Sequence, residues 1–330
     1  MLPDYNTCID RIKAYNQTGV YKKQIREIST HPPQLKFGFK DFWKYKTVVE
    51  NEGCSILDAK YISDTALKLH DFLDSWGMRR SGIAEPKDIE QILNKIRPYY
   101  DHIQSVMLGS GQMCHNEKWI EAVYDSLDGI TNLSQYPDGG KSSVTGKSKT
   151  LLALWGQTPG FDSLITTNFL KWSHSPAPLK LRQLRRGEEW YKPNEFFAMI
   201  VDLDEWVLSW SKHNNNRSFS DSFSNLCSGL PVGRIIDQVY NWEYEYDPLI
   251  YYLNLLKKQG RSEASLSFKE LEGVLGFDLC KSAYEDPKWW EDNIVKLLEK
   301  AQKKAFKKGN YVWKKDKLDI LGQNVHFVLS

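Results

Sequence analysis

GGKSSVTGKSKTLLALWGQTPGFDS, residues Gly139–Ser163, separates two interpretations of this chain, a nucleotide-binding α/β fold and a helical one. A P-loop has four residues between its first glycine and its Gly-Lys pair, so that successive N–H groups wrap one phosphate. Here five residues separate Gly140 from Gly146, and no apolar strand precedes them. These departures speak against a P-loop, and we expect residues 131–148 to form a loop by composition.

Apolar residues recur at helical spacing on both sides of this loop, which predicts a mainly α fold. The predicted helices of this part are 65–78, 87–100 (ending at Pro98), 116–127, 148–156, 161–172, 194–213 and 230–242. We group them as a helical body spanning residues 1–243, with a sub-boundary near 131–148. The sequence leaves the fold of residues 1–60 open.

The last part of the chain, residues 244–330, has a different sequence pattern. Two amphipathic segments, 246–260 and 266–277, are followed by a basic helix within 281–309 and by alternating residues from Tyr311 that indicate a hairpin. Helix, turn, helix, basic helix and hairpin is the element order of a winged-helix module. We therefore predict a small α+β domain that resembles a winged helix.

Composition limits the class of protein. The chain has 330 residues and a formal net charge of +2, so any contact with nucleic acid must depend on local patches of charge. Its 5 cysteines contain no Cys-x-x-Cys pair, which fits a reducing cytoplasm, and no metal site is predicted. No segment has the pattern of a signal peptide or of a membrane span, so we expect a cytoplasmic protein without membrane contact.

The segment VTGKSKTLLALWG has the outline of a helix-hairpin-helix motif, in which N–H groups at a helix start point at a DNA phosphate. Gly146, Lys147, Ser148 and Lys149 would make these contacts. Here the chain resembles the helix-hairpin-helix DNA glycosylases, whose hairpin is followed by an essential aspartate at the start of a helix. Asp162 occupies a comparable place.

The resemblance implies an enzyme that hydrolyses the N-glycosidic bond of a modified or unusual base, for example in invading DNA. Asp162 would be the catalytic carboxylate, and no cofactor would be needed. The chain departs from the family pattern in three ways. Ser148 replaces the second glycine, Asp162 follows Lys149 by 13 positions where about twenty are common, and Lys149 lies one position before the family's nucleophilic lysine. Asp162 is also a good helix N-cap, so a DNA-binding accessory or sensor protein of a defence system, without chemistry, stays an alternative.

Aromatic and basic residues near Asp162 are further candidates for DNA contact. A base must leave the stack before its sugar bond is attacked, and flat side chains then sandwich it. The candidates for stacking are Trp155, Phe161, Trp172, Trp190 and Tyr191, although most such residues belong to cores. Arg182, Arg185 and Arg186 suit phosphate contact or a solvated loop equally well.

A lysine-rich tract lies near the C-terminus. Residues 296–317 contain nine lysines and two acids. We expect Lys303, Lys304, Lys307 and Lys308 to contact DNA, because each neutralised phosphate releases a counterion. A solvated helix end, favoured by the helix dipole, is the competing interpretation.

Residues 244–330 also resemble a small uncharacterised bacterial domain found in defence-associated or DNA-linked proteins. The resemblance lies in YDPLIYYL, LSFKELEGVLGFDLCKSA, WWEDN and the closing hairpin. It implies a context of DNA or defence and no particular reaction.

A weaker alternative is a metal-dependent nuclease. Glu52, Asp58 and Lys60 are the residue types that hold Mg²⁺ and a water, but such sites need them on adjoining strands. The surroundings of these residues have a helical pattern.

Overall fold

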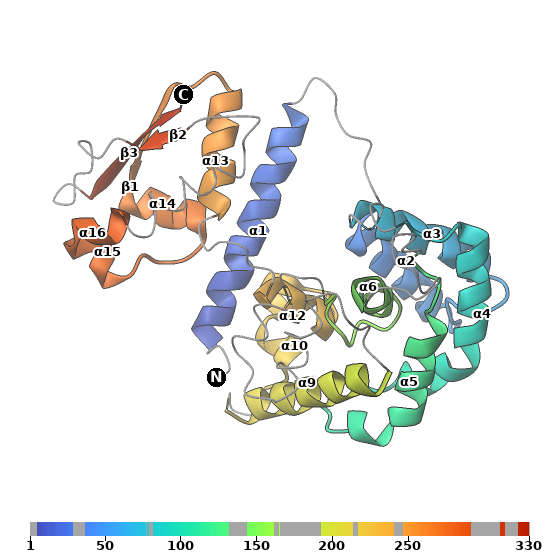
Figure 1. Ribbon diagram of the computed structural model, residues 1–330. Helices are drawn as coiled ribbons and strands as arrows, with labels where there is room; N and C mark the ends of the chain where they lie inside the picture. Colours follow the sequence, from blue (N-terminus) through green and yellow to red (C-terminus); the bar gives the residue numbers. More distant parts are fainter. Residues whose placement is uncertain are drawn as a thin grey trace. The chain divides into compact units, whose positions relative to one another are not determined.

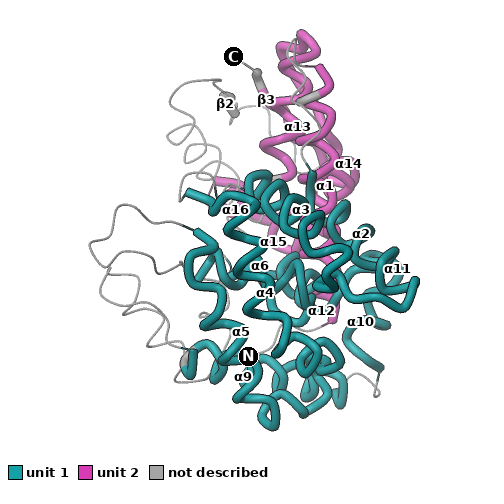
Figure 2. Tube along the Cα trace, turned by 90° about the vertical axis from the view of Figure 1, so that its right-hand side faces the viewer, with its two compact units in different colours: residues 1–3, 35–240 teal, residues 4–34, 241–330 magenta. Residues whose placement is uncertain are grey.

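The computed structural model describes residues 5–28, 37–76, 78, 82–131, 144–161, 165, 193–213, 217–240, 247–291, 311–313 and 323–329. The chain divides into two compact units, unit 1 of residues 1–3 and 35–240 and unit 2 of residues 4–34 and 241–330 (Figure 2). Its described part is mainly α-helical and contains one small three-stranded sheet. No described helix combines the length and apolarity that crossing a bilayer requires.

Unit 1 is built from helices that pack on one another (Figure 1). Its described helices are α2 Phe39–Asn51, α3 Ile62–Ser75, α4 Pro86–Ile103, the 3₁₀ turn η2 Met113–His115, α5 Glu117–Ser126, α6 Val144–Leu154, α9 Pro193–His213, α10 Phe219–Ser222, α11 Ser224–Cys227 and α12 Val232–Tyr240. Helix α3 packs on α4, α4 on α5 and α5 on α9, while α6 contacts both α2 and α3.

The amphipathic helices of unit 1 confirm the predicted periodicity, with one correction. Ile89, Ile92 and Ile96 are buried on one face of α4, as their spacing predicts. The predicted end at Pro98 is wrong, because α4 continues to Ile103. Tyr100 and Ile103 are both buried, so packing of the last turn outweighs the backbone hydrogen bond that proline removes.

Unit 2 combines the two ends of the chain. It contains α1 Tyr5–Glu27, α13 Asp247–Lys258, β1 Glu263–Ser267, α14 Phe268–Leu275, α15 Lys281–Glu285, α16 Pro287–Trp290, β2 Tyr311–Trp313 and β3 Asn324–Leu329. Helix α1 packs on α13 and α14. The sequence grouped α1 with the helical body, and the structure instead places it in unit 2, where the Tyr21 and Tyr252 rings meet edge to face at 5.4 Å.

The sheet of unit 2 is antiparallel, with strand order β1-β3-β2. Val328 of β3 lies between Glu263 of β1 and Val312 of β2, so these three residues form one row across the sheet. The pairing of β2 with β3 agrees with the predicted hairpin. Strand β1 was not predicted, since its short apolar alternation merges with the helical pattern that follows.

Helix α14 has clear start and stop signals. Ser267 accepts the Glu270 N–H at 3.2 Å, and the Glu270 carboxylate accepts the Ser267 N–H at 2.8 Å, which is a capping box. The helix ends at Gly276, whose φ of +82° favours glycine. Phe268, Trp290 and Phe327 are fully buried in the core that α14 shares with the sheet.

Candidate functional site

The predicted phosphate-binding residues lie in a helix. Helix α6 begins at Val144, so Gly146, Lys147, Ser148 and Lys149 belong to its first turns and not to a hairpin turn (Figure 1). All four residues are buried. The expected exposed turn is therefore absent from the described part of this stretch, and DNA contact by these four residues stays a prediction.

Both lysines of this group have partners inside unit 1. The Lys147 side chain is 6% exposed, with its Nζ 2.6 Å from Asp128 Oδ1 and 4.5 Å from the centre of the Tyr124 ring. Lys149 Nζ donates to the Trp76 carbonyl at 3.3 Å. A buried ammonium group is tolerated only when it is paired or hydrogen-bonded, so these contacts stabilise both charges where they lie. Contact with a phosphate would require each lysine to leave them.

The segment that precedes Asp162 is held by side chains from two helices. Ser148 Oγ of α6 accepts the Phe161 N–H at 2.9 Å, and Thr145 Oγ1 donates to the Phe161 carbonyl at 3.1 Å. Asp237 of α12 accepts the Gly160 N–H at 3.1 Å. The backbone is thus fixed on both sides of the Phe161 side chain, one residue before the candidate catalytic carboxylate.

A buried charged cluster lies beside this segment, and sequence reasoning missed it. Arg234 and Asp237 of α12 form an ion pair, and both residues are buried. The Arg234 guanidinium lies 4.7 Å from the centre of the Trp76 ring, and Lys149 lies 5.5 Å from the same ring. Arginine and aspartate three positions apart in a mostly apolar helix were the available signal.

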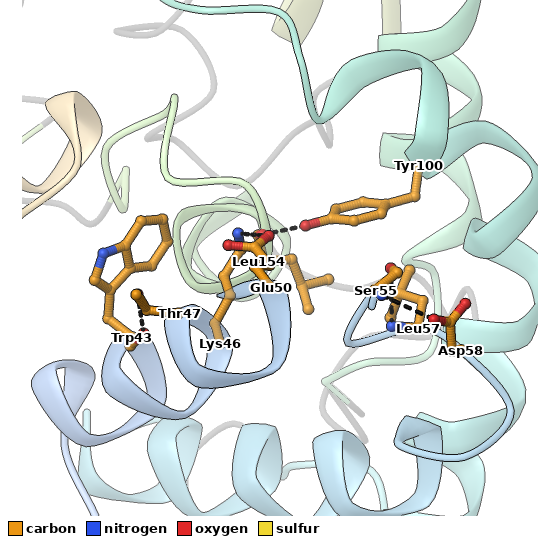
Figure 3. A network of polar contacts seen from close by, with 9 residues as sticks. All are labelled: Trp43, Lys46, Thr47, Glu50, Ser55, Leu57, Asp58, Tyr100 and Leu154. Carbon is orange, nitrogen blue, oxygen red and sulfur yellow. Dashed lines mark hydrogen bonds and ion pairs between the residues drawn. The ribbon is translucent and has the colours of Figure 1, made fainter. Parts of the chain in front are cut away.

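The other end of α6 is fixed by a second polar network (Figure 3). The Tyr100 hydroxyl of α4 donates to the Leu154 carbonyl at 2.5 Å, and burial raises the pKa of Tyr100 well above its usual value. Lys46 of α2 is buried and pairs with Glu50. Because α6 is held at both ends, its residues have a structural role that does not depend on a ligand.

Two of the candidates for base stacking are core residues. Trp155 is 3% exposed and donates its indole N–H to the Val106 carbonyl at 3.1 Å. Phe161 is 2% exposed and meets the Phe196 ring edge to face. The remaining candidates lie outside the described residues: Asp162, Trp172, Arg182, Arg185, Arg186, Trp190, Tyr191, Lys303, Lys304, Lys307 and Lys308.

The residues of the nuclease alternative lie at the end of α2 and in the turn before α3, not on strands. The Tyr61 hydroxyl donates to Glu52 at 2.6 Å and accepts from Lys60 at 2.9 Å. Asp58 accepts the Ser55 N–H at 2.8 Å. In the described part of the chain no group of three or more His, Cys, Asp or Glu side chains is arranged to hold a metal ion. The geometry gives this alternative no support.

A hollow of about 510 Å³ on unit 1 is lined by Glu117, Glu121 and Asp125 of α5, together with Lys118, Ala122 and Pro193. Desolvation, with a smaller contribution from Glu117, raises the pKa of Glu121. Three carboxylates repel a phosphate backbone, so this hollow is a poor candidate for DNA contact.

Comparison of the chain with protein-family models, with curated proteins and with solved structures finds no match. The functional argument therefore depends on the geometry and charge of the two units.

Proposed function

We propose that the protein binds duplex DNA and that unit 2 is a winged-helix-like module that makes the contact. The observation that carries the proposal is the order of elements in unit 2. Helix α13 is followed by β1, α14, α15 and α16 and then by the hairpin of β2 and β3, with sheet order β1-β3-β2. This order agrees with a winged helix, in which the last two strands form the wing.

The charge of the sequence supports the same proposal. Lys303, Lys304, Lys307 and Lys308 immediately precede β2, which begins at Tyr311. Each lysine that neutralises a phosphate releases about 0.9 counterion equivalents. Four such contacts would lower the logarithm of the binding constant with a slope of about 3.6 against the logarithm of the salt concentration. Unit 1 contributes less to this argument, because the lysines of α6 have internal partners.

The test is the fluorescence anisotropy of a labelled duplex, titrated with the full chain at several salt concentrations. The variant changes these four lysines to glutamine, and the control changes Lys87, Lys95, Lys118 and Lys212, which are exposed on unit 1. We expect the first variant to bind at least about tenfold more weakly with a smaller salt slope, and the control to match the parent. Equal binding by parent, variant and control would contradict the proposal.

Base excision by Asp162 is a second candidate function. The observation that favours it is that Ser148 and Thr145 fix the backbone of Phe161. A catalytic carboxylate must be held in position by the residues around it, and Phe161 directly precedes Asp162. In that reaction Asp162 would stabilise positive charge that develops on the deoxyribose and would orient a water molecule.

Alkali treatment distinguishes excision from binding alone. DNA that contains modified bases is incubated with the protein in the absence of metal ions and is then heated with alkali, which breaks the strand at abasic sites. Breaks at one base type that Asp162→Asn abolishes, while DNA affinity is kept, are the expected result for an excision enzyme. Binding without breaks on every substrate would leave DNA binding as the function and remove the chemistry.

A further inference from the structure

We infer that α1 and the end of α13 together form a second basic surface that contacts the DNA backbone. This inference rests on the proposed DNA binding by unit 2. The surface, called the α1–α13 patch below, consists of Lys22, Lys23, Lys257, Lys258 and Arg261. It joins residues from the two ends of the chain, so no sequence window contains it.

Two side-chain contacts bring the two halves of the patch together. Lys258 Nζ donates to the Ile25 carbonyl at 3.5 Å, and Lys22 Nζ lies 4.8 Å from the centre of the Tyr251 ring. These contacts advance in the same direction along both helices, so α1 and α13 run parallel and end at the same end of unit 2. Figure 2 shows both helices within this unit.

The patch is exposed and carries an excess of positive charge. Lys22, Lys23, Lys258 and Arg261 are exposed, and the Lys23 side chain is 79% accessible. Two acids lie close to it along these segments: Glu27 is 3.8 Å from Lys23 of the patch, and Glu263 is 3.3 Å from His326. The patch has five cations against these two carboxylates, so an excess of positive charge remains.

The helix dipole offers a simpler reason for lysines at a helix end. It favours Lys257 and Lys258 in the last turn of α13. It does not account for Arg261, which lies beyond the end of α13. The dipole therefore explains part of the patch and leaves Lys22, Lys23 and Arg261 to another cause.

The register of the sheet places this patch at the end of the sheet where β2 begins. Glu263, Val328 and Val312 form one row, so the start of β1 and the start of β2 lie at the same end of the sheet. Two strand spacings, about 9.6 Å, separate β1 from β2. Arg261 precedes β1 by two residues, and in the sequence Lys308 precedes β2 by three. Because both segments lead into strands at this end of the sheet, we expect one DNA backbone to meet both sets of cations.

The test uses the duplex titration of the full chain with a third variant. It changes Lys22, Lys23, Lys258 and Arg261 to glutamine and leaves the half-buried Lys257 in place. We expect affinity to fall at least about tenfold, with the salt slope lowered by about 0.9 for each residue that contacts a phosphate. Thermal unfolding of the variant should stay close to that of the parent, because the four side chains are exposed and their single surface contacts contribute little to stability.

The outcomes separate this inference from the proposed function. If the tract variant loses affinity while the patch variant binds with the affinity and salt slope of the parent, DNA binding stands and the patch inference is overturned. If the parent itself does not bind DNA, both are overturned. The same variant is also assayed on vesicles of phosphatidylcholine and phosphatidylglycerol. Loss of vesicle binding with DNA affinity unchanged would assign the patch to an anionic membrane surface and overturn the inference.

Discussion

Substitution of Ser148 tests whether α6 has a structural role or contacts DNA. Its hydroxyl is fully buried and accepts the Phe161 N–H at 2.9 Å. In Ser148→Ala the amide loses the acceptor that Ser148 supplies, and a buried donor that loses its acceptor destabilises the fold by about 1–3 kcal/mol. With a urea m-value of about 2.5 kcal/mol per M, a loss of 2 kcal/mol lowers the midpoint by roughly 0.8 M.

The assay is urea unfolding followed by tryptophan fluorescence, with the DNA titration run in parallel. Ser224→Ala is the matched control, because Ser224 is exposed and donates only to the nearby Asp221 carbonyl at 3.0 Å. We expect the control to stay within about 0.5 kcal/mol of the parent. Unchanged stability of Ser148→Ala together with weakened DNA binding would refute the structural interpretation and return Ser148 to the phosphate contact that the sequence predicted.

Three further predictions concern unit 1. Gly156→Ala should destabilise the protein by about 3 kcal/mol in thermal unfolding, because φ is +78° and a Cβ would lie 2.6 Å from the Trp43 ring; an unchanged melting temperature would contradict this. Asp128→Asn removes the charge that pairs with buried Lys147, so we expect a loss of about 1–3 kcal/mol in urea unfolding, and a gain in stability would show that the pair is not needed. Burial raises the pKa of Cys227 to about 11 from the ordinary value of 9.0. Since the folded state favours the neutral thiol, the stability that Cys227 contributes is present below pH 9 and is lost between about pH 9 and 11. Unfolding of the parent and of Cys227→Ala across that range would measure this loss, and equal losses in both proteins would contradict the prediction.

The helices of unit 1 could be predicted because their signal is local. A repeat of 3.6 residues requires only neighbouring apolar positions, and α3, α4 and α5 each keep it. The error at Pro98 shows the limit of such rules. Packing of Tyr100, whose hydroxyl reaches the Leu154 carbonyl, depends on a helix far along the chain.

The burial of the α6 lysine side chains could not be predicted either, because it also depends on contacts with distant parts of the chain. Lysine next to glycine and serine is typical of an exposed phosphate loop, but the partners of Lys147 and Lys149 are Asp128 and Trp76, which belong to other elements. Nothing within the segment itself indicates these contacts. Membership of α1 in unit 2 is likewise a long-range property, since the packing of α1 on α13 joins the two ends of the sequence.

Unit 2 is assembled from two distant segments of the chain, and this affects both its synthesis and its truncated fragments. Because α1 is made before unit 1 and α13 after it, the ribosome must complete the entire body before this module can assemble its core. A fragment that begins at residue 244 would lack the helix that covers α13 and α14, and it should expose apolar surface and aggregate. Because α1 and α13 run parallel, a shortened version of the module would need α1 joined to residue 241 by a linker long enough to return along α1.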